Sequence, residues 1–286
     1  MRLKSDAIRR LGVIAVLIVF VAFALGPLVH IVLKSFMSTI QTPEGSAGTL
    51  TLAWYARAMS DHELKAAVQY SIVIGLVVGC VSAVLGFLGA LTWWSPRQRN
   101  VLLIAEFICA LSPGEAHALG LADVLSVAGL PTSGFLPIVI AHVIWTLPFV
   151  TVISMVGTSY ISRSLIEAGL ELSTRLKVVL RVVVPLVLPS LASAFLVGLL
   201  LSFNESSRGY FLAAAQQTIG QFARGKMRSG MDPSAQAIAS IDVMLGALTL
   251  VAMAVGFYRT RRLNNRAAGA VGRVTSGEPI GAWRQS

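Results

Sequence analysis

The chain has 286 residues, of which 55% are hydrophobic and only 13% are charged, and its mean hydropathy is +0.76. Because soluble domains carry about a quarter charged residues, this composition excludes an ordinary soluble protein. The formal net charge of +10 does not by itself indicate nucleic-acid binding, since membrane proteins concentrate basic residues on their cytoplasmic side. The composition predicts a protein that crosses the membrane several times.

Six segments are long and apolar enough to cross a bilayer as a helix, which takes about 20 residues. The third is the weakest, because Pro113-Gly114 interrupts it. The first exceeds the usual 7–15 residues of a signal-peptide core, so we expect it to be retained. The six lie near Leu11–Leu33, Ala66–Trp94, Val101–Leu125, Phe135–Ser154, Val184–Phe203 and Gln236–Tyr258.

Basic residues predict how these spans are oriented. If the N-terminus is cytoplasmic, the cytoplasmic segments carry most of the 23 Lys and Arg residues, as the positive-inside rule requires. We therefore expect an all-α membrane protein with six transmembrane helices and both termini inside. Residues 1–10 would be a cytoplasmic N-terminus, 11–258 the transmembrane domain, and 259–286 a basic, disordered cytoplasmic tail. The moderately polar segment 35–65 is expected to pack across the outer end of the bundle.

The most informative stretch joins the fourth and fifth spans. Residues 162–172 combine apolar positions at helical spacing with opposite charges four residues apart, Arg163–Glu167 and Glu171–Arg175. A second short helix can begin at Ser173 or Thr174 and run through Val183 into the fifth span. These patterns alone favour either an interaction element on the cytoplasmic face or a passive loop.

The amino-acid sequence of this stretch resembles the signature of a known family. Glu167-Ala168-Gly169, then Ser173, then Val184-Pro185-Leu186-Val187-Leu188-Pro189 resembles the EAA-x3-G…LP signature of binding-protein-dependent ABC importer permeases. The similarity covers roughly residues 25–260. Further matches resemble the spermidine/putrescine permeases: Gln69-Tyr70-Ser71-Ile72, Ser112-Pro113, His142, Leu147-Pro148-Phe149, Leu201-Ser202-Phe203 and Met231-Asp232-Pro233.

This resemblance implies a permease subunit that alternates access and does no covalent chemistry. In the family the EAA loop, here residues 160–184, forms coupling helices that sit in a cleft of the ATPase. The implied partners are two copies of an ABC ATPase, a second and different permease chain, and an extracytoplasmic substrate-binding protein, in the bacterial inner membrane. ATP and magnesium would bind to the ATPase, and this chain would bind no cofactor, metal or nucleic acid. The implied ATPase-coupling residues are Glu167, Ala168, Gly169, Ser173 and Arg175.

Two letters of the coupling loop depart from the family signature. Gly169 stands where the family has its second alanine, and Ser173 stands where it has glycine. A glycine there ends a helix in the left-handed conformation at no steric cost. Ser173 must therefore tolerate strain or end the helix in another way.

Residues 220–227, Gly-Gln-Phe-Ala-Arg-Gly-Lys-Met, come close to a phosphate-binding loop. Such a loop needs Ser or Thr at its last position to hold magnesium, and it follows a strand. Met227 cannot bind magnesium, and no strand is expected before it. ATP hydrolysis is therefore expected from a partner.

Carboxylates inside the spans are the candidates for a cargo path, because ionisable groups in a bilayer are costly and mark functional sites. Apart from Lys34 at the edge, no Lys or Arg is expected within the outer halves of these spans. A cation such as a polyamine is therefore the favoured cargo. The candidate path residues are Glu115, Asp123, Glu205 and Asp242.

The outer loop 204–235 is unexpectedly basic for the predicted topology. Arg224, Lys226 and Arg228 are candidates for docking the acidic surface of a substrate-binding protein, with lipid headgroups as the alternative. Other cargoes stay open, since related permeases handle ferric iron and aminoalkylphosphonates. A stand-alone secondary transporter is the alternative of another class.

Overall fold

Helices make up nearly all of the computed structural model, which describes residues 2–42, 45–92, 95–228, 236–244, 246–251, 254–255 and 258. A π-helical turn, Val179–Val183, continues α8 into α9, and a hairpin pairs β1 (Met37–Thr42) with β2 (Gly45–Leu50). The predicted tail 259–286 lies outside the described residues. The helices are α1 (Arg2–Ser35), α2 (Ala53–Ser60), α3 (His62–Ala90), α4 (Pro96–Leu111), α5 (Gly114–Val127), α6 (Phe135–Ser159), α7 (Arg163–Leu172), α8 (Arg175–Val178), α9 (Val184–Phe203), α10 (Ser207–Leu212) and α11 (Ile219–Arg228).

The helical membrane fold predicted from composition is confirmed. Helices α4 and α5 meet at a bend of 104° and count as a fifth span if they cross the membrane together, and the described part of the predicted sixth span is a shorter apolar helix, Gln236–Val251. The described residues thus contain four to five candidate spans, and the six-span topology stays a prediction. The four single helices long and apolar enough to cross a membrane are Leu11–Ser35, His62–Ala90, Phe135–Ser159 and Arg175–Phe203.

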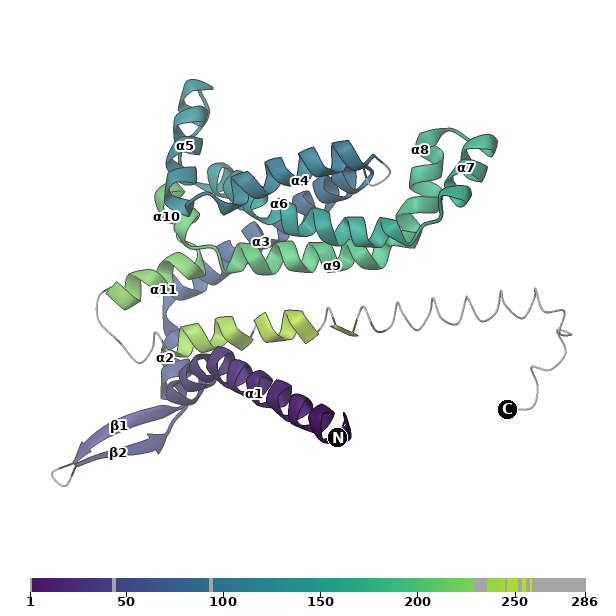
Figure 1. The fold of residues 1–286 in the computed structure, drawn as a ribbon. Coiled ribbons are helices and arrows are strands. Elements are labelled where there is room, and N and C mark those ends of the chain that lie inside the picture. The colour runs from purple at the N-terminus through teal and green to yellow at the C-terminus, as the bar shows by residue number, and fades with distance from the viewer. Residues whose placement is uncertain are drawn as a thin grey trace, which may run out of the picture.

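The centre of the bundle is formed by α3, α6 and α9, which contact one another along much of their length (Figure 1). Small residues allow this close approach. A Cβ atom added at Gly198 on α9 would lie only 3.3 Å from the Cα of Gly79 on α3. The buried hydroxyls of Ser82 and Thr146 join α3 to α6 through a 2.7 Å hydrogen bond. The packing of this centre determines where both ends of the bundle lie.

The predicted interruption of the third span is confirmed. Helix α4 ends at Leu111, and α5 starts after Pro113 in a new direction. Proline has no N–H to continue the helical hydrogen bonds, which favours a break at this point. A buried cluster that includes Ala118, Ile138 and Leu212 then holds α5 against α6 and α10.

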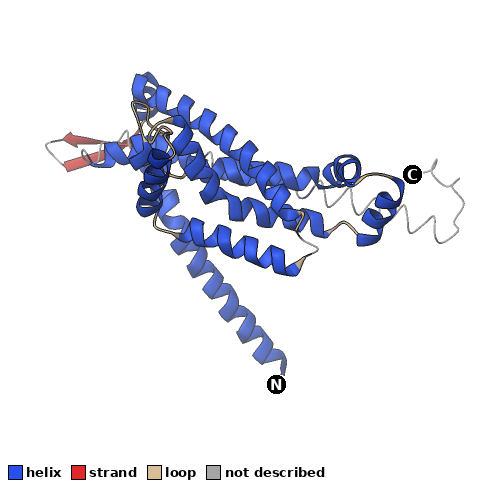
Figure 2. Cartoon of the chain, turned by 90° about the horizontal axis from the view of Figure 1, so that it is seen from above, coloured by secondary structure: helices blue, strands red, loops and turns tan. Residues whose placement is uncertain are grey.

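The outer segment between α1 and α3 differs from its prediction. Residues 37–50 form a hairpin that extends away from the bundle (Figures 1 and 2), so the expectation that this part of segment 35–65 packs across the bundle is wrong. The two strands pair their backbone N–H and C=O groups with each other, so these groups need no hydrogen-bond partner from the bundle. Helix α2 does pack, since the hydroxyl of Tyr55 lies 2.6 Å from Ser35 Oγ and 2.7 Å from Ser240 Oγ.

We predict that Gly157→Val lowers the thermal unfolding midpoint of the purified protein, because a Cβ at Gly157 would lie 2.5 Å from the side chain of Ser190. Overpacking of this kind costs about 1–3 kcal/mol. Gly120→Val on α5 is the matched control, since a Cβ there has no neighbour within 4 Å. Equal losses in the two variants would contradict the close approach of α6 and α9.

Candidate functional site

One end of the bundle carries a protruding pair of helices, α7 and α8, which join α6 to α9 (Figure 1). Helix α7 begins after Ser162, whose hydroxyl accepts a hydrogen bond from the Leu165 N–H at 3.4 Å. Arg163 and Glu167 form a 2.8 Å salt bridge, with 78% and 59% of their side chains exposed. Exposed pairs contribute about 0–1 kcal/mol. The predicted coupling residues Glu167, Ala168 and Arg175 are thus solvent-facing and available to a partner.

The structure explains the two residues of the coupling loop that depart from the family signature, Gly169 and Ser173. Ser173 has φ −159° and ψ 169°, so α7 ends in extended backbone without needing the left-handed conformation that a glycine would supply. A Cβ added at Gly169 would lie 3.1 and 3.2 Å from the two methyl groups of Val178. Glycine therefore allows α7 to lie close against α8. A cavity of about 150 Å³ beside this crossing is lined by Leu91, Ile166, Leu170, Val178 and Val183.

The opposite end of the bundle contains a buried ion pair. Glu205, 7% exposed, and Arg208, 4% exposed, are joined by a 2.8 Å bond from Nη1 to Oε2. The other carboxylate oxygen accepts the Arg208 backbone N–H at 2.9 Å. Arg208 lies beyond the predicted fifth span, so the expectation that the spans themselves lack arginine in their outer halves did not include this partner of Glu205. Arg208 lies on α10, five residues after the last residue of α9, and its side chain turns back to the Glu205 carboxylate.

Arg208 also binds the end of the broken span. Its Nη2 donates to the carbonyl oxygens of Ala110 at 2.9 Å and Ser112 at 3.1 Å, and its guanidinium lies 4.6 Å from the ring centroid of Trp145. Sequence reasoning gave no role to Arg208 or Trp145. The available signal was the i, i+3 spacing of opposite charges at the end of a span. The pair ties α10 to the last turn of α4.

The remaining path candidates are spread over the same end. Glu115 and Asp123 lie on the unbroken helix α5, about 12 Å apart along its axis from the helical rise; Glu115 is half-buried and Asp123 exposed. Glu115 lies 4.0 Å from Arg224. Asp242 is half-buried on the helix Gln236–Val251, and in the described part of the chain it makes no hydrogen bond or ion pair with the other three. The four carboxylates are not brought together into one site.

The three predicted docking residues all lie on α11 and contact neighbouring side chains. Arg224 and Arg228 are each 5.9 Å from the ring of Tyr210, and Arg228 donates to the Tyr210 hydroxyl at 3.3 Å. Lys226 lies 3.9 Å from Asp61 and 5.2 Å from the ring of Phe222. Arg224 and Arg228, which both lie beside Tyr210, are called the basic face of α11 below, whereas Lys226 lies toward Asp61. Helix α11 is at the end of the molecule opposite α7 (Figure 1).

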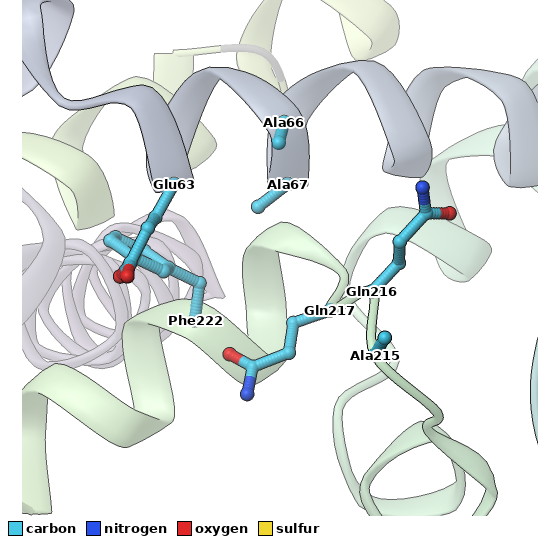
Figure 3. Close-up of a pocket in the computed structure, with 7 residues that line it drawn as sticks. All are labelled: Glu63, Ala66, Ala67, Ala215, Gln216, Gln217 and Phe222. Atoms are coloured by element: carbon cyan, nitrogen blue, oxygen red, sulfur yellow. The ribbon is translucent and has the colours of Figure 1, made fainter.

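A cavity of about 250 Å³ lies between the start of α3 and the segment that leads into α11 (Figure 3). Figure 3 shows the Glu63 carboxylate beside the ring of Phe222, with Gln216 and Gln217 on the opposite wall. None of the four predicted path carboxylates lines this cavity. Among the described residues, no three His, Cys, Asp or Glu side chains come together as a metal site.

The amino-acid sequence is similar to those of two transport-system permeases. The chain is 27% identical to the "Putrescine transport system permease protein PotI" of Escherichia coli over 272 residues, covering 88% of this chain and 92% of that protein. It is 25% identical to the "Spermidine/putrescine transport system permease protein PotC" of Haemophilus influenzae over 202 residues, covering 69% and 78%. No protein-family model matches.

A solved structure supports the fold. The chain aligns with a bacterial ABC transporter involved in the import of the acidic polysaccharide alginate, with a TM-score of 0.62 and 15% identity over 92% of this chain and 99% of the other. At this identity the likeness shows the fold alone. Together with the sequence relatives, it shows that the chain is similar to ABC importer permeases of the inner membrane, among them the spermidine/putrescine permeases at about 25% identity.

Proposed function

We propose that this permease subunit carries a polyamine of the spermidine/putrescine kind, or another small cation, across the membrane. The observation that carries the proposal is its similarity to two separate groups of polyamine-system permeases, over 69% and 88% of the chain. The outer end adds support, because Asp123 is an exposed carboxylate there and Asp242 a half-buried one, whereas Glu115 lies 4.0 Å from Arg224. Glu205 is already neutralised by Arg208.

We place both termini in the cytoplasm and count six spans, with the described helix Gln236–Val251 as part of the sixth. This orientation puts α7 and α8 inside and α5, α10 and α11 outside. It also puts the exposed charges of α7 where an ATPase can reach them. The assembly would contain two copies of that ATPase, which binds ATP and magnesium, a second permease of a different chain, and an extracytoplasmic binding protein. Residues 1–10, 11–258 and 259–286 would be its cytoplasmic, transmembrane and tail segments.

Helices α7 and α8 are the proposed coupling element, through Glu167, Ala168, Gly169, Ser173 and Arg175. Support comes from their exposure and from the close crossing at Gly169, which makes the two helices one compact protrusion. Because α7 and α8 connect α6 directly to α9, a push on this protrusion acts on two helices of the central bundle.

We predict that Glu167→Lys reduces the amount of ATPase that copurifies with the permease by about tenfold or more, the factor given by roughly 1.4 kcal/mol of lost binding. The change removes only an exposed salt bridge, so the unfolding midpoint of the permease itself should stay close to that of the wild type. Glu167→Gln is the milder companion variant and should lose less ATPase. Full retention of the ATPase by Glu167→Lys would exclude this residue from the contact.

The basic face of α11 is the proposed docking surface for the binding protein. We predict that the double variant Arg224→Glu, Arg228→Glu weakens stimulation of ATP hydrolysis by the loaded binding protein. The loss should be larger at 0.01 M than at 0.15 M salt, because screening shortens the reach of charges from about 30 to 8 Å. Arg97→Glu, an exposed arginine placed on the cytoplasmic side, is the control. If the loss of stimulation is the same at both salt concentrations, these residues do not dock the binding protein and are contacts to lipid headgroups instead.

The cargo itself is best identified on the partner binding protein, which holds much of the selectivity. We predict that putrescine or spermidine raises the unfolding temperature of this binding protein in a concentration-dependent way, as any ligand of the native state does. Ferric iron and 2-aminoethylphosphonate are the comparison ligands. Stabilisation by one of these, with none by either polyamine, would reject polyamine import.

A further inference from the structure

The guanidinium of Arg208 occupies an enclosed site rather than a surface position. Its contacts are the carboxylate of Glu205 at 2.8 Å, the carbonyl oxygens of Ala110 and Ser112 at 2.9 and 3.1 Å, and the face of Trp145 with its centroid at 4.6 Å. Only 5% of the arginine side chain is exposed. We call these four surrounding groups the cation cage. They come from α4 and the residue after it, from α6, and from the residues following α9.

The chemistry of the cation cage is not specific to guanidinium. A carboxylate and two carbonyl oxygens accept hydrogen bonds from any N–H donor, and the face of an indole ring attracts an alkylammonium as it attracts a guanidinium. A buried carboxylate without a cation is strongly unfavourable. A positive charge in the cage stabilises the ionised Glu205, and an ammonium group satisfies the same acceptors as the guanidinium.

The position of the cage places it between the outer surface and the bundle interior. On its outer side Gly114 packs against Arg208, and the half-buried Glu115 follows. On its inner side the ring of Phe149 lies 5.5 Å from that of Trp145, one turn further along α6. Phe107 on α4 lies 5.9 Å beyond it.

A second carboxylate lies at the inner end of this aromatic row. Glu106, next to Phe107, accepts a hydrogen bond from Thr151 at 3.1 Å through one oxygen, and its other oxygen is buried without a hydrogen-bond partner among the described residues. The rings of Phe149 and Phe107 thus connect the cation cage to the carboxylate of Glu106, one oxygen of which can still accept a hydrogen bond.

We propose that Arg208 is a tethered occupant of a cargo site, and that an ammonium group of the cargo displaces its guanidinium from the cation cage. Exchange of one cation for another keeps Glu205 neutralised throughout, so the cage is never empty. When the cargo moves on toward Phe149 and Glu106, Arg208 returns and closes the cage. This assignment rests on the proposed cargo being a polyamine or another small cation.

The direct test uses the purified importer complex with Arg208→Ala and putrescine as the probe. The variant should unfold at a lower temperature than the wild type. Putrescine at millimolar concentration should then raise its midpoint by about 2 °C or more, the size expected for a ligand well above its dissociation constant. The double variant Arg208→Ala, Glu205→Gln should lose this response. Arg224→Ala, an exposed arginine, is the matched control and should show no such gain.

Methylguanidinium is the second probe and separates a cargo site from a purely structural arginine. If it stabilises Arg208→Ala while putrescine does not, the cage is specific for guanidinium and the proposal is overturned. The absence of any shift with either compound overturns it as well. The binding-protein screen tests the polyamine proposal without using this chain, so a failure there is distinguishable from a failure at the cage.

If Arg208→Ala does not yield a folded complex, the wild-type importer supplies the measurement. Arg208 is buried and should react slowly with phenylglyoxal, which modifies accessible arginines. Putrescine delivered by the loaded binding protein in the presence of ATP should raise the modification of Arg208 several-fold, as measured by mass spectrometry of its peptide. Unchanged or reduced modification would overturn displacement by cargo.

Discussion

Close packing of α3, α6 and α9 is the constraint on which both ends of this protein depend. In lipid, helices gain little from burying apolar surface against each other, so association needs close contact and hydrogen bonds between helices. Gly79 and Gly198 supply the contact, and the 2.7 Å bond between Ser82 and Thr146 supplies one of the bonds. The bond between His142 and Ser202, 2.9 Å long, joins α6 to α9 in the same way.

The two ends use this frame differently. At the α7 end, a short amphipathic helix leaves its charges exposed, which is the arrangement needed for contact with a soluble partner. At the α11 end, Glu205 and Arg208 form a buried ion pair, while Asp123 and Arg224 are exposed. Breaking such a buried pair by removing one partner costs about 3–5 kcal/mol. A rearrangement that separates them therefore requires a replacement cation or an input of free energy of this size.

Composition and local pattern were sufficient for much of the fold. Runs of apolar residues predicted the helices that became α3, α6 and α9, and Pro113 predicted the break between α4 and α5. The hairpin 37–50 was missed because a short strand pair in a polar segment produces no strong periodic signal. The 104° bend was also beyond sequence reasoning, since its direction depends on contacts of α5 with α10.

The candidate sites were predictable to different extents. The coupling loop was found because its letters resemble a family signature, whereas the reason for Gly169 appeared only once Val178 was seen beside it. The ion pair of Glu205 was missed because Arg208 stands beyond the predicted span, and the spacing of three residues there was not read as a pair. Trp145 lies in a different helix, and only the folded chain brings it over Arg208.

The most direct test of polyamine import is uptake by the reconstituted transporter. Proteoliposomes that contain this permease with its partner permease and ATPase, supplied with the binding protein outside and ATP inside, should accumulate radiolabelled putrescine or spermidine. Uptake should disappear when ATP is replaced by ADP. ATP-dependent uptake of another cargo with no accumulation of either polyamine, or polyamine uptake that persists without ATP and without the ATPase subunit, would contradict the account.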